Sequence, residues 1–111
     1  MKLIIGIVQD EDELGLVEDL TENGYRVTKL STTGGFLRSG NTTLLIGVED
    51  EEVERVIALI EQNGKSREVT TAFVAGAMGA VHEAGYMPYP VNIHVGGATV
   101  FVLDVDEFHK F

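Results

Sequence analysis

The residues best suited to bind a small ligand lie in one short segment, Thr32–Thr43, which reads TTGGFLRSGNTT. Its glycines, Gly34, Gly35 and Gly40, allow positive φ angles and let a ligand approach the main chain closely. Successive backbone N–H groups in such a turn can hold a phosphate. Arg38 adds a positive charge. The segment therefore contains the groups that an anionic ligand needs.

Other side chains of the same segment point to a nucleotide. Asn41 offers a hydrogen-bond donor and an acceptor, which together can read the edge of a base. Phe36 and Leu37 are apolar residues in a polar loop, and they need a base or a neighbouring subunit to cover them. A second interpretation is a β-hairpin loop whose Phe-Leu pair fills the protein's own core. The segment is neither a P-loop nor a GxGxxG motif, so composition alone leaves both interpretations open.

Residues for catalysis or metal binding are sparse elsewhere. The three histidines, His82, His94 and His109, have no metal-ligand spacing. The chain has no cysteine, and no Gly-x-Ser-x-Gly motif occurs. The acidic runs Asp10–Glu13 and Glu49–Glu54 fit helix starts better than an acid/base pair. We therefore expect a binding protein that is not an enzyme and that uses neither a metal nor a cofactor.

The overall charge limits the partners. A formal net charge of −10 argues against binding DNA, RNA or anionic lipid, because each needs a basic surface. No segment approaches the ~20 apolar residues of a membrane span. The run Leu3–Val8 is too short for a signal peptide and continues into acidic residues. We expect a cytoplasmic protein, in keeping with the absence of cysteine.

A weak repeat with a 40-residue period organises the first half of the chain. Val8–Asp12 (VQDED) corresponds to Val48–Glu52 (VEDEE), and Asn23-Gly24 corresponds to Asn63-Gly64. Each copy predicts a strand, an acidic helix start and an amphipathic helix that ends at Asn-Gly. The repeat therefore predicts two equivalent strand–helix units.

Strands surround these helices. Leu3–Val8 is apolar on both faces, as a central strand is. Tyr25–Leu30, Thr42–Val48 and Thr99–Val105 are rich in β-branched and aromatic residues, and Val91–Val95 is a further candidate. The order predicts an α+β, ferredoxin-like βαββαβ antiparallel sheet with both helices on one face. At 111 residues, we expect one domain.

One connection is long for this fold. Loops of more than ~12–15 residues are usually functional or disordered, and Lys65–Pro90 exceeds that length. Its glycines argue against a stable helix over Ala72–Ala84. We predict a mobile loop at about 65–90, before the last strands, and the sequence leaves the structure of 69–86 open.

Several stretches closely resemble the cyclic-di-AMP receptor proteins of the PII-like (nitrogen-regulatory-like) signalling superfamily. They are Arg26–Leu30 (RVTKL), Thr32–Gly47 (TTGGFLRSGNTTLLIG) and Gly96–Phe111 (GGATVFVLDVDEFHKF). The start IIGIVQD and the stretch PYPVNIHVGG also fit. The likeness covers nearly the whole chain and is poorest at Val69–Tyr86.

This resemblance implies a homotrimer that binds cyclic di-AMP in the clefts between subunits. Loop rearrangement would then carry the signal to an unknown downstream protein. The implied ligand-binding residues are Arg26 and Thr28 on the second strand, Gly35, Phe36 and Leu37 in the loop, Asn41 at a base, the Gly47 backbone, Phe101, and Lys110 at the pocket edge.

Two alternatives remain beside this reading. One is a PII-type sensor of ATP or 2-oxoglutarate. The loop between the second and third strands is short for such a sensor, and the sequence has no set of lysines and arginines for a triphosphate. The other is an enzyme or metal-binding trimer of the same fold, which lacks a catalytic or ligand constellation in this sequence.

Overall fold

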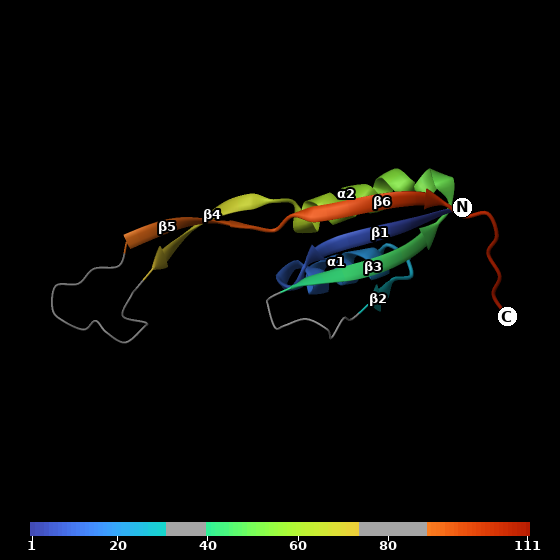
Figure 1. Cartoon of the computed structure of the whole chain (residues 1–111), viewed down its shortest axis with the longest axis horizontal. Helices are drawn as coiled ribbons and strands as arrows, with labels where there is room; N and C mark the ends of the chain where they lie inside the picture. Colours follow the sequence, from blue (N-terminus) through green and yellow to red (C-terminus); the bar gives the residue numbers. More distant parts are fainter. Residues whose placement is uncertain (31–39, 74–88) are drawn as a thin grey trace. The chain divides into compact units, whose positions relative to one another are not determined.

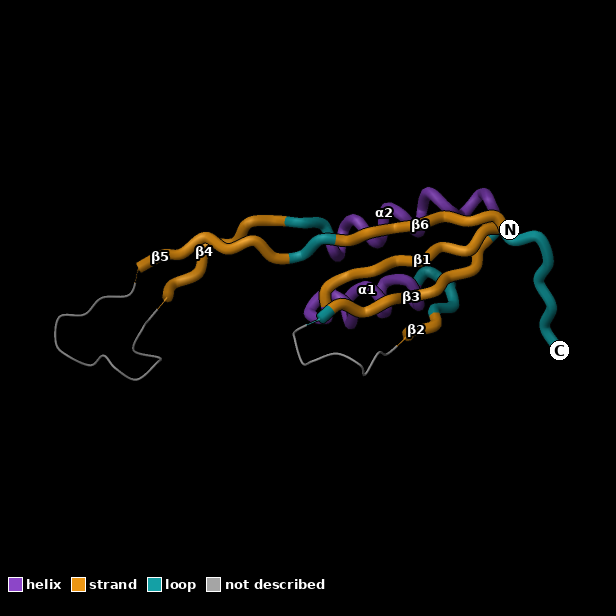
Figure 2. Tube along the Cα trace, in the orientation of Figure 1, coloured by secondary structure: helices purple, strands orange, loops and turns teal. Residues whose placement is uncertain are grey.

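A computed structural model describes residues 1–30, 40–73 and 89–111, with the side chains of 70–73 and 89–91 outside the description. The chain divides into two units, one of Met1–Lys65 with Gly96–Phe111 and the other of Ser66–Val95. In chain order the first unit contains β1 (Lys2–Gln9), α1 (Asp10–Glu22), β2 (Thr28–Leu30), β3 (Asn41–Val48), a short 3-10 helix η1 (Asp50–Glu52), α2 (Val53–Gly64) and β6 (Ala98–Asp104) (Figures 1 and 2).

The four strands of the first unit form one antiparallel sheet in the order β2-β3-β1-β6. The predicted central position of β1 is confirmed, because β1 pairs with both β3 and β6. Ile5, at the middle of β1, lies opposite Leu45 on one side and Phe101 on the other. The sheet and its two helices confirm the ferredoxin-like α+β fold that the sequence predicts.

The helices begin and end much as the repeat predicts. Helix α1 follows β1 without a loop, and its first turn is wholly acidic, which suits the positive end of the helix dipole. It ends at Glu22 with Asn23 as its C-cap, and Gly24 then adopts a φ of 89° that glycine accepts without strain. Helix α2 runs through Gly64, and the chain turns to extended backbone at Lys65.

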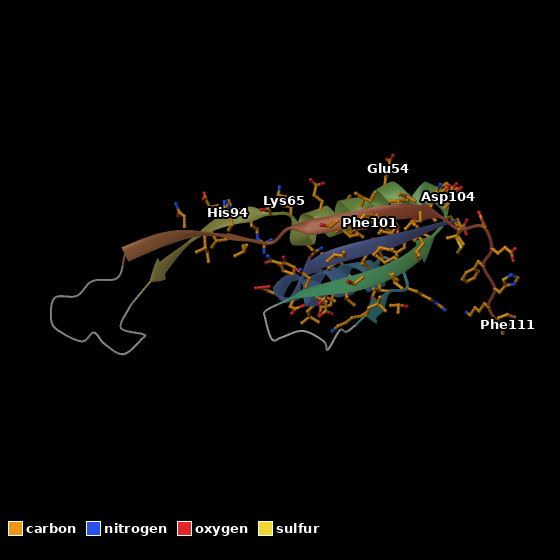
Figure 3. The ribbon with its side chains drawn as sticks, viewed as in Figure 1. Glu54, Lys65, His94, Phe101, Asp104 and Phe111 are labelled. Atoms are coloured by element: carbon orange, nitrogen blue, oxygen red, sulfur yellow. The ribbon has the colours of Figure 1, made fainter. Side chains whose placement is uncertain are left out.

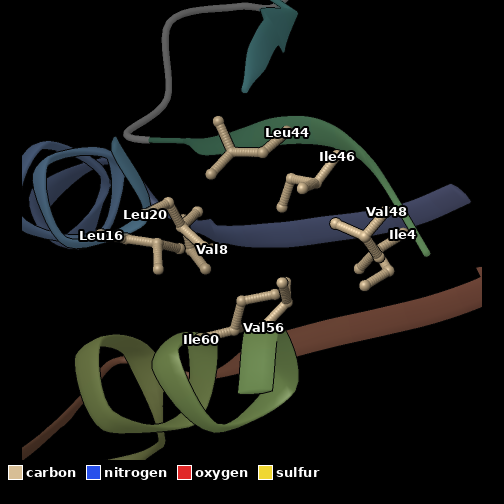
Figure 4. Close-up of a cluster of buried hydrophobic side chains, with 9 residues drawn as sticks. All are labelled: Ile4, Val8, Leu16, Leu20, Leu44, Ile46, Val48, Val56 and Ile60. Carbon is tan, nitrogen blue, oxygen red and sulfur yellow. The ribbon is translucent and has the colours of Figure 1, made fainter. Parts of the chain in front are cut away.

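The core lies between the sheet and the helices (Figure 4). Alternate residues of β1 and β3 face the helices, and each helix contributes one apolar stripe. The buried side chains of this core are Ile4, Val8, Leu16, Leu20, Leu44, Ile46, Val48, Val56 and Ile60.

The second strand is shorter than predicted. β2 pairs with β3 from Thr28 onward, whereas the sequence predicted a strand from Tyr25. The Tyr25 amide instead donates to the Leu20 carbonyl (2.9 Å) and closes the end of α1. Arg26 therefore precedes the strand, which corrects the prediction that it lies on it.

The second unit contains a strand that the sequence analysis did not predict. β4 (Arg67–Phe73) pairs antiparallel with β5 (Tyr89–Val95), from Arg67 opposite Val95 to Phe73 opposite Tyr89. The expected strand at Val91–Val95 falls within β5. The predicted mobility of this region stays a prediction, and residues 74–88 lie outside the described part of the chain.

A side-chain hydrogen bond joins the segment after α1 to η1, directly before α2. The Tyr25 hydroxyl donates to Glu52, and this bond, with desolvation and the negative charge of Glu52, raises the pKa of Tyr25. A raised pKa means that the bond stabilises the fold below the unfolded pKa and is lost as the pH rises through the folded one.

We expect Tyr25→Phe to lower the free energy of unfolding at neutral pH by about 1 kcal/mol. The difference from the wild type should shrink above pH ~10, where the unfolded phenol ionises. Urea denaturation of both proteins, at equal concentration and at several pH values, measures it. Equal stabilities at pH 7 would show that the hydrogen bond contributes nothing.

Candidate functional site

The sheet has a second face, opposite the helices, and we call it the open face. Side chains alternate along a strand and directly opposed residues share a face, so the register defines its members. They are Leu3, Ile5, Ile7 and Gln9 of β1, Thr28 and Leu30 of β2, Asn41, Thr43, Leu45 and Gly47 of β3, and Thr99, Phe101 and Leu103 of β6.

The open face is apolar and carries no charge. The chain has 8 basic and 18 acidic residues, yet none of them occupies an open-face position on the four described strands. Its apolar side chains keep contact with solvent: Phe101 is 51% exposed and Leu103 is 44% exposed. An exposed apolar surface of this kind marks a site for a partner or a ligand.

Four predicted ligand residues share this face. Thr28 and Phe101 belong to one row that crosses the whole sheet, in which Thr28 opposes Leu45, Leu45 opposes Ile5, and Ile5 opposes Phe101. Gly47 is exposed, and a Cβ built on it meets nothing within 4 Å. The backbone of β3 can therefore be approached closely at that position.

The four residues do not form one compact pocket within a subunit. Asn41 begins β3, and Gly47 lies six residues along it, which places them roughly 20 Å apart at the rise of an antiparallel strand. One small ligand cannot touch both on the same subunit.

The remaining predicted residues lie elsewhere. Arg26 is exposed in the segment before β2, and Lys110 is exposed in the tail after β6. That tail leaves the end of the sheet, where the Val105 amide donates to the Met1 carbonyl (3.2 Å), and Figure 3 shows Phe111 at its end and Phe101 on β6. Gly35, Phe36 and Leu37 lie outside the described residues.

The base of the loop is held by a residue that sequence analysis assigned only to a helix start. The Asp10 carboxylate accepts hydrogen bonds from the Thr42 hydroxyl (2.6 Å) and the Gly40 amide (3.3 Å). The Asp10 amide donates in turn to the Gly40 carbonyl (3.1 Å). Only the antiparallel register, which brings the end of β1 beside the start of β3, reveals this role.

Charged side chains surround the sheet rather than line its open face. Lys29 pairs with Glu13 at 3.3 Å, and Lys2 pairs with Asp104. The hydrogen bond and charge of Asp104 raise the pKa of Lys2, and those of Lys2 lower the pKa of Asp104. Lys2, Lys29 and Asp104 are strand residues that alternate onto the helix side of the sheet, and Glu13 belongs to α1.

Comparison with known families gives the geometry a context. A family model described as "Cyclic-di-AMP receptor" matches residues 1–111, the whole chain. The chain belongs to the cyclic-di-AMP receptor family. Membership in this receptor family supports binding of cyclic di-AMP and a role in binding rather than catalysis.

A solved structure is similar to this cyclic-di-AMP receptor over its full length. It is a protein of unknown function from Pediococcus pentosaceus ATCC 25745, which shares 44% sequence identity and has a TM-score of 0.76. The match covers 99% of this chain and 96% of the other.

Two further features concern the described residues alone. No group of three or more histidines and carboxylates among them is arranged to hold a metal ion. Neither of the described α-helices has the length and apolar character to cross a membrane.

Proposed function

We propose that this receptor binds cyclic di-AMP in clefts between the subunits of a cytoplasmic homotrimer with PII-like organisation. Binding rearranges the loops and so changes the surface that a downstream protein reads. The observation that carries the proposal is the open face, which is apolar, free of charge and holds Thr28, Asn41, Gly47 and Phe101.

The properties of the open face support the proposed assembly. Covering its half-exposed aliphatic and aromatic side chains with a second copy would remove apolar surface from water and so stabilise the assembly. Its lack of charge removes the cost of burying unpaired ions. Asn41 and Gly47 are too far apart along β3 to contact one ligand within a single copy, but a cleft between two copies can place Asn41 of one beside Gly47 of the other.

The chemistry of the residues suits a cyclic dinucleotide. Phe101 offers a ring on which an adenine can stack, and Asn41 offers the donor and acceptor for an adenine edge. Arg26 supplies positive charge for a phosphate, while Thr28 and the bare Gly47 backbone give polar contacts. Lys110 lies near the pocket edge in this proposal. The proposal involves neither a metal nor a cofactor.

The loop residues complete the proposed site. Gly35 and its successors Phe36 and Leu37 would line the adenine and phosphate region, as the resemblance implies. Their structure lies outside the described residues, and the proposal rests on the sheet.

Titration calorimetry with matched dinucleotides tests the proposal. We expect cyclic di-AMP to bind with a Kd on the order of 1 µM or tighter, and cyclic di-GMP to bind more weakly because Asn41 reads the adenine edge. Light scattering should give the mass of a trimer. Failure to bind cyclic di-AMP, or equal affinity for both dinucleotides, would reject the proposed ligand. Displacement by ATP would favour the nitrogen-regulatory type of sensor.

A further inference from the structure

Gln9, the last residue of β1, and Asp10, the first residue of α1, both contact the start of β3 around Asn41. Asp10 bonds to the chain on both sides of Asn41, to the Gly40 amide and to the Thr42 hydroxyl. A carboxylate that accepts from an N–H and an O–H group makes stronger hydrogen bonds than a neutral acceptor. The backbone position of Asn41 is therefore set by the side chain of Asp10.

The same contacts set the direction of the Asn41 side chain. Thr42 is buried on the helix side, where its hydroxyl reaches Asp10. Because neighbouring residues of a strand point to opposite faces, holding Thr42 on the helix side keeps Asn41 on the open face. Without the Thr42 hydroxyl bond this end of β3 would fray, because Asn41 and Thr42 are its first paired residues.

Gln9 lies on the other side of Asn41. The two residues are directly opposed in the β1–β3 register and so have Cβ atoms about 4.5–5.5 Å apart on the open face. The Gln9 side chain accepts a hydrogen bond from the Gly96 amide (Oε1 to N, 2.8 Å). Gly96 directly follows β5 in the chain. Gln9 is thus adjacent to Asn41 and is also bonded to Gly96, just before the chain enters β6.

We propose that Asp10 and Gln9 are positioning residues for Asn41: Asp10 fixes the direction in which Asn41 meets an adenine, and Gln9 connects the occupancy of Asn41 to Gly96. The inference rests on the proposed function, since Asn41 is its base-reading residue. A group bound at Asn41 displaces or polarises the adjacent Gln9 amide, and the Gln9–Gly96 hydrogen bond responds. Gly96 has a φ of 86°, a conformation that glycine adopts readily and other residues rarely do.

The first experiment separates positioning from stability. Thr42→Val removes the hydroxyl and keeps the buried shape, whereas Thr42→Ser keeps the hydroxyl and serves as the matched control. We expect Thr42→Val to weaken cyclic di-AMP binding about tenfold and to reduce its preference over cyclic di-GMP. Asp10→Asn should act in the same direction, and Thr42→Ser should stay within about twofold of the wild type. A Thr42→Val protein with the wild-type ratio of affinities would overturn the positioning role, whatever its Tm.

The second experiment follows Gly96 itself. In amide ¹H–¹⁵N spectra of the wild type, we expect the Gly96 signal to shift when cyclic di-AMP is added. Gln9→Met keeps the length of the side chain and removes its oxygen. In this variant the Gly96 signal should no longer respond, while the Gly47 signal still reports the bound ligand. An equal Gly96 response in Gln9→Met would overturn the connection.

The two levels of the hypothesis fail in different ways. If the wild type does not bind cyclic di-AMP, the proposed function fails and the positioning role falls with it. If the wild type binds and discriminates, and the Thr42→Val and Gln9→Met variants behave identically to it, only the positioning role fails. Hydrogen exchange of the Gly40 amide in ligand-free protein adds an independent check, because Asp10→Asn should accelerate it.

Discussion

Replacing Ile5 with glutamate is expected to dissociate the proposed homotrimer into monomers and to abolish binding of cyclic di-AMP. Ile5 is at the centre of the open face, between Leu45 and Phe101. An unpaired carboxylate buried there would cost at least ~3 kcal/mol in each subunit. The helix-facing core of the monomer does not include Ile5, so the fold should persist. Light scattering, circular dichroism and calorimetry measure the mass, fold and binding.

A matched variant controls for the added charge. Leu14 is 65% exposed on α1, away from the open face, and Leu14→Glu should keep both the trimer and the ligand affinity. A trimeric Ile5→Glu protein would show that the subunits do not associate through the open face. Monomers that still bind cyclic di-AMP would show that one subunit contains a complete site.

The second large effect is expected for Phe101→Ala. If the Phe101 ring stacks on an adenine, its removal costs roughly 1–3 kcal/mol per base, which raises Kd by about 5- to 150-fold. Phe101→Tyr keeps the ring and should retain most of the affinity. Calorimetry on both variants, with light scattering to confirm the trimer, gives the comparison.

Val102 is the natural control for Phe101. It is the next residue of β6 and is 42% exposed, but it opposes Ile4 and so lies on the helix side. Val102→Ala should change Kd by less than about twofold, since surface substitutions away from a site have small effects. If the two alanine variants lose affinity equally, the face of β6 does not determine binding, and Phe101 is not a ligand residue.

Local sequence patterns predicted most of the first unit. The acidic helix starts, the Asn-Gly ends and the 40-residue repeat located both helices and the strands before them. These signals are short-range, because the helix dipole and the C-terminal glycine act within one turn. The β-branched and aromatic run Thr99–Val105 also located β6, although the sequence could not say which face of the sheet the helices cover.

What the sequence missed depends on contacts between distant segments. Strand β4 forms by pairing with β5, and Phe73 and Tyr89 are 16 residues apart in the chain, so no local signal announced it. The double-sided apolar pattern of Leu3–Val8 was equally ambiguous. A face that covers the core and a face that awaits a partner have the same composition, and only the positions of the helices distinguish them.

The position of the site residues shows the same limit. The resemblance named Asn41, and the structure adds that Asp10 bonds on either side of it. Asp10 sits in an acidic run whose helix-start role explained it fully. The register of β1 against β3, which no local pattern encodes, gives this carboxylate its second set of partners.

The second unit, Ser66–Val95, is inserted at a point where the chain tolerates changes in length. The Gly97 amide donates to the Gly64 carbonyl at 2.6 Å. This hydrogen bond joins the two places where the chain leaves and rejoins the first unit. Residues added or removed between these points change the closure entropy only logarithmically. Insertions or deletions between Gly64 and Gly97 should therefore cost little stability and leave the packing of α2 against β6 unchanged.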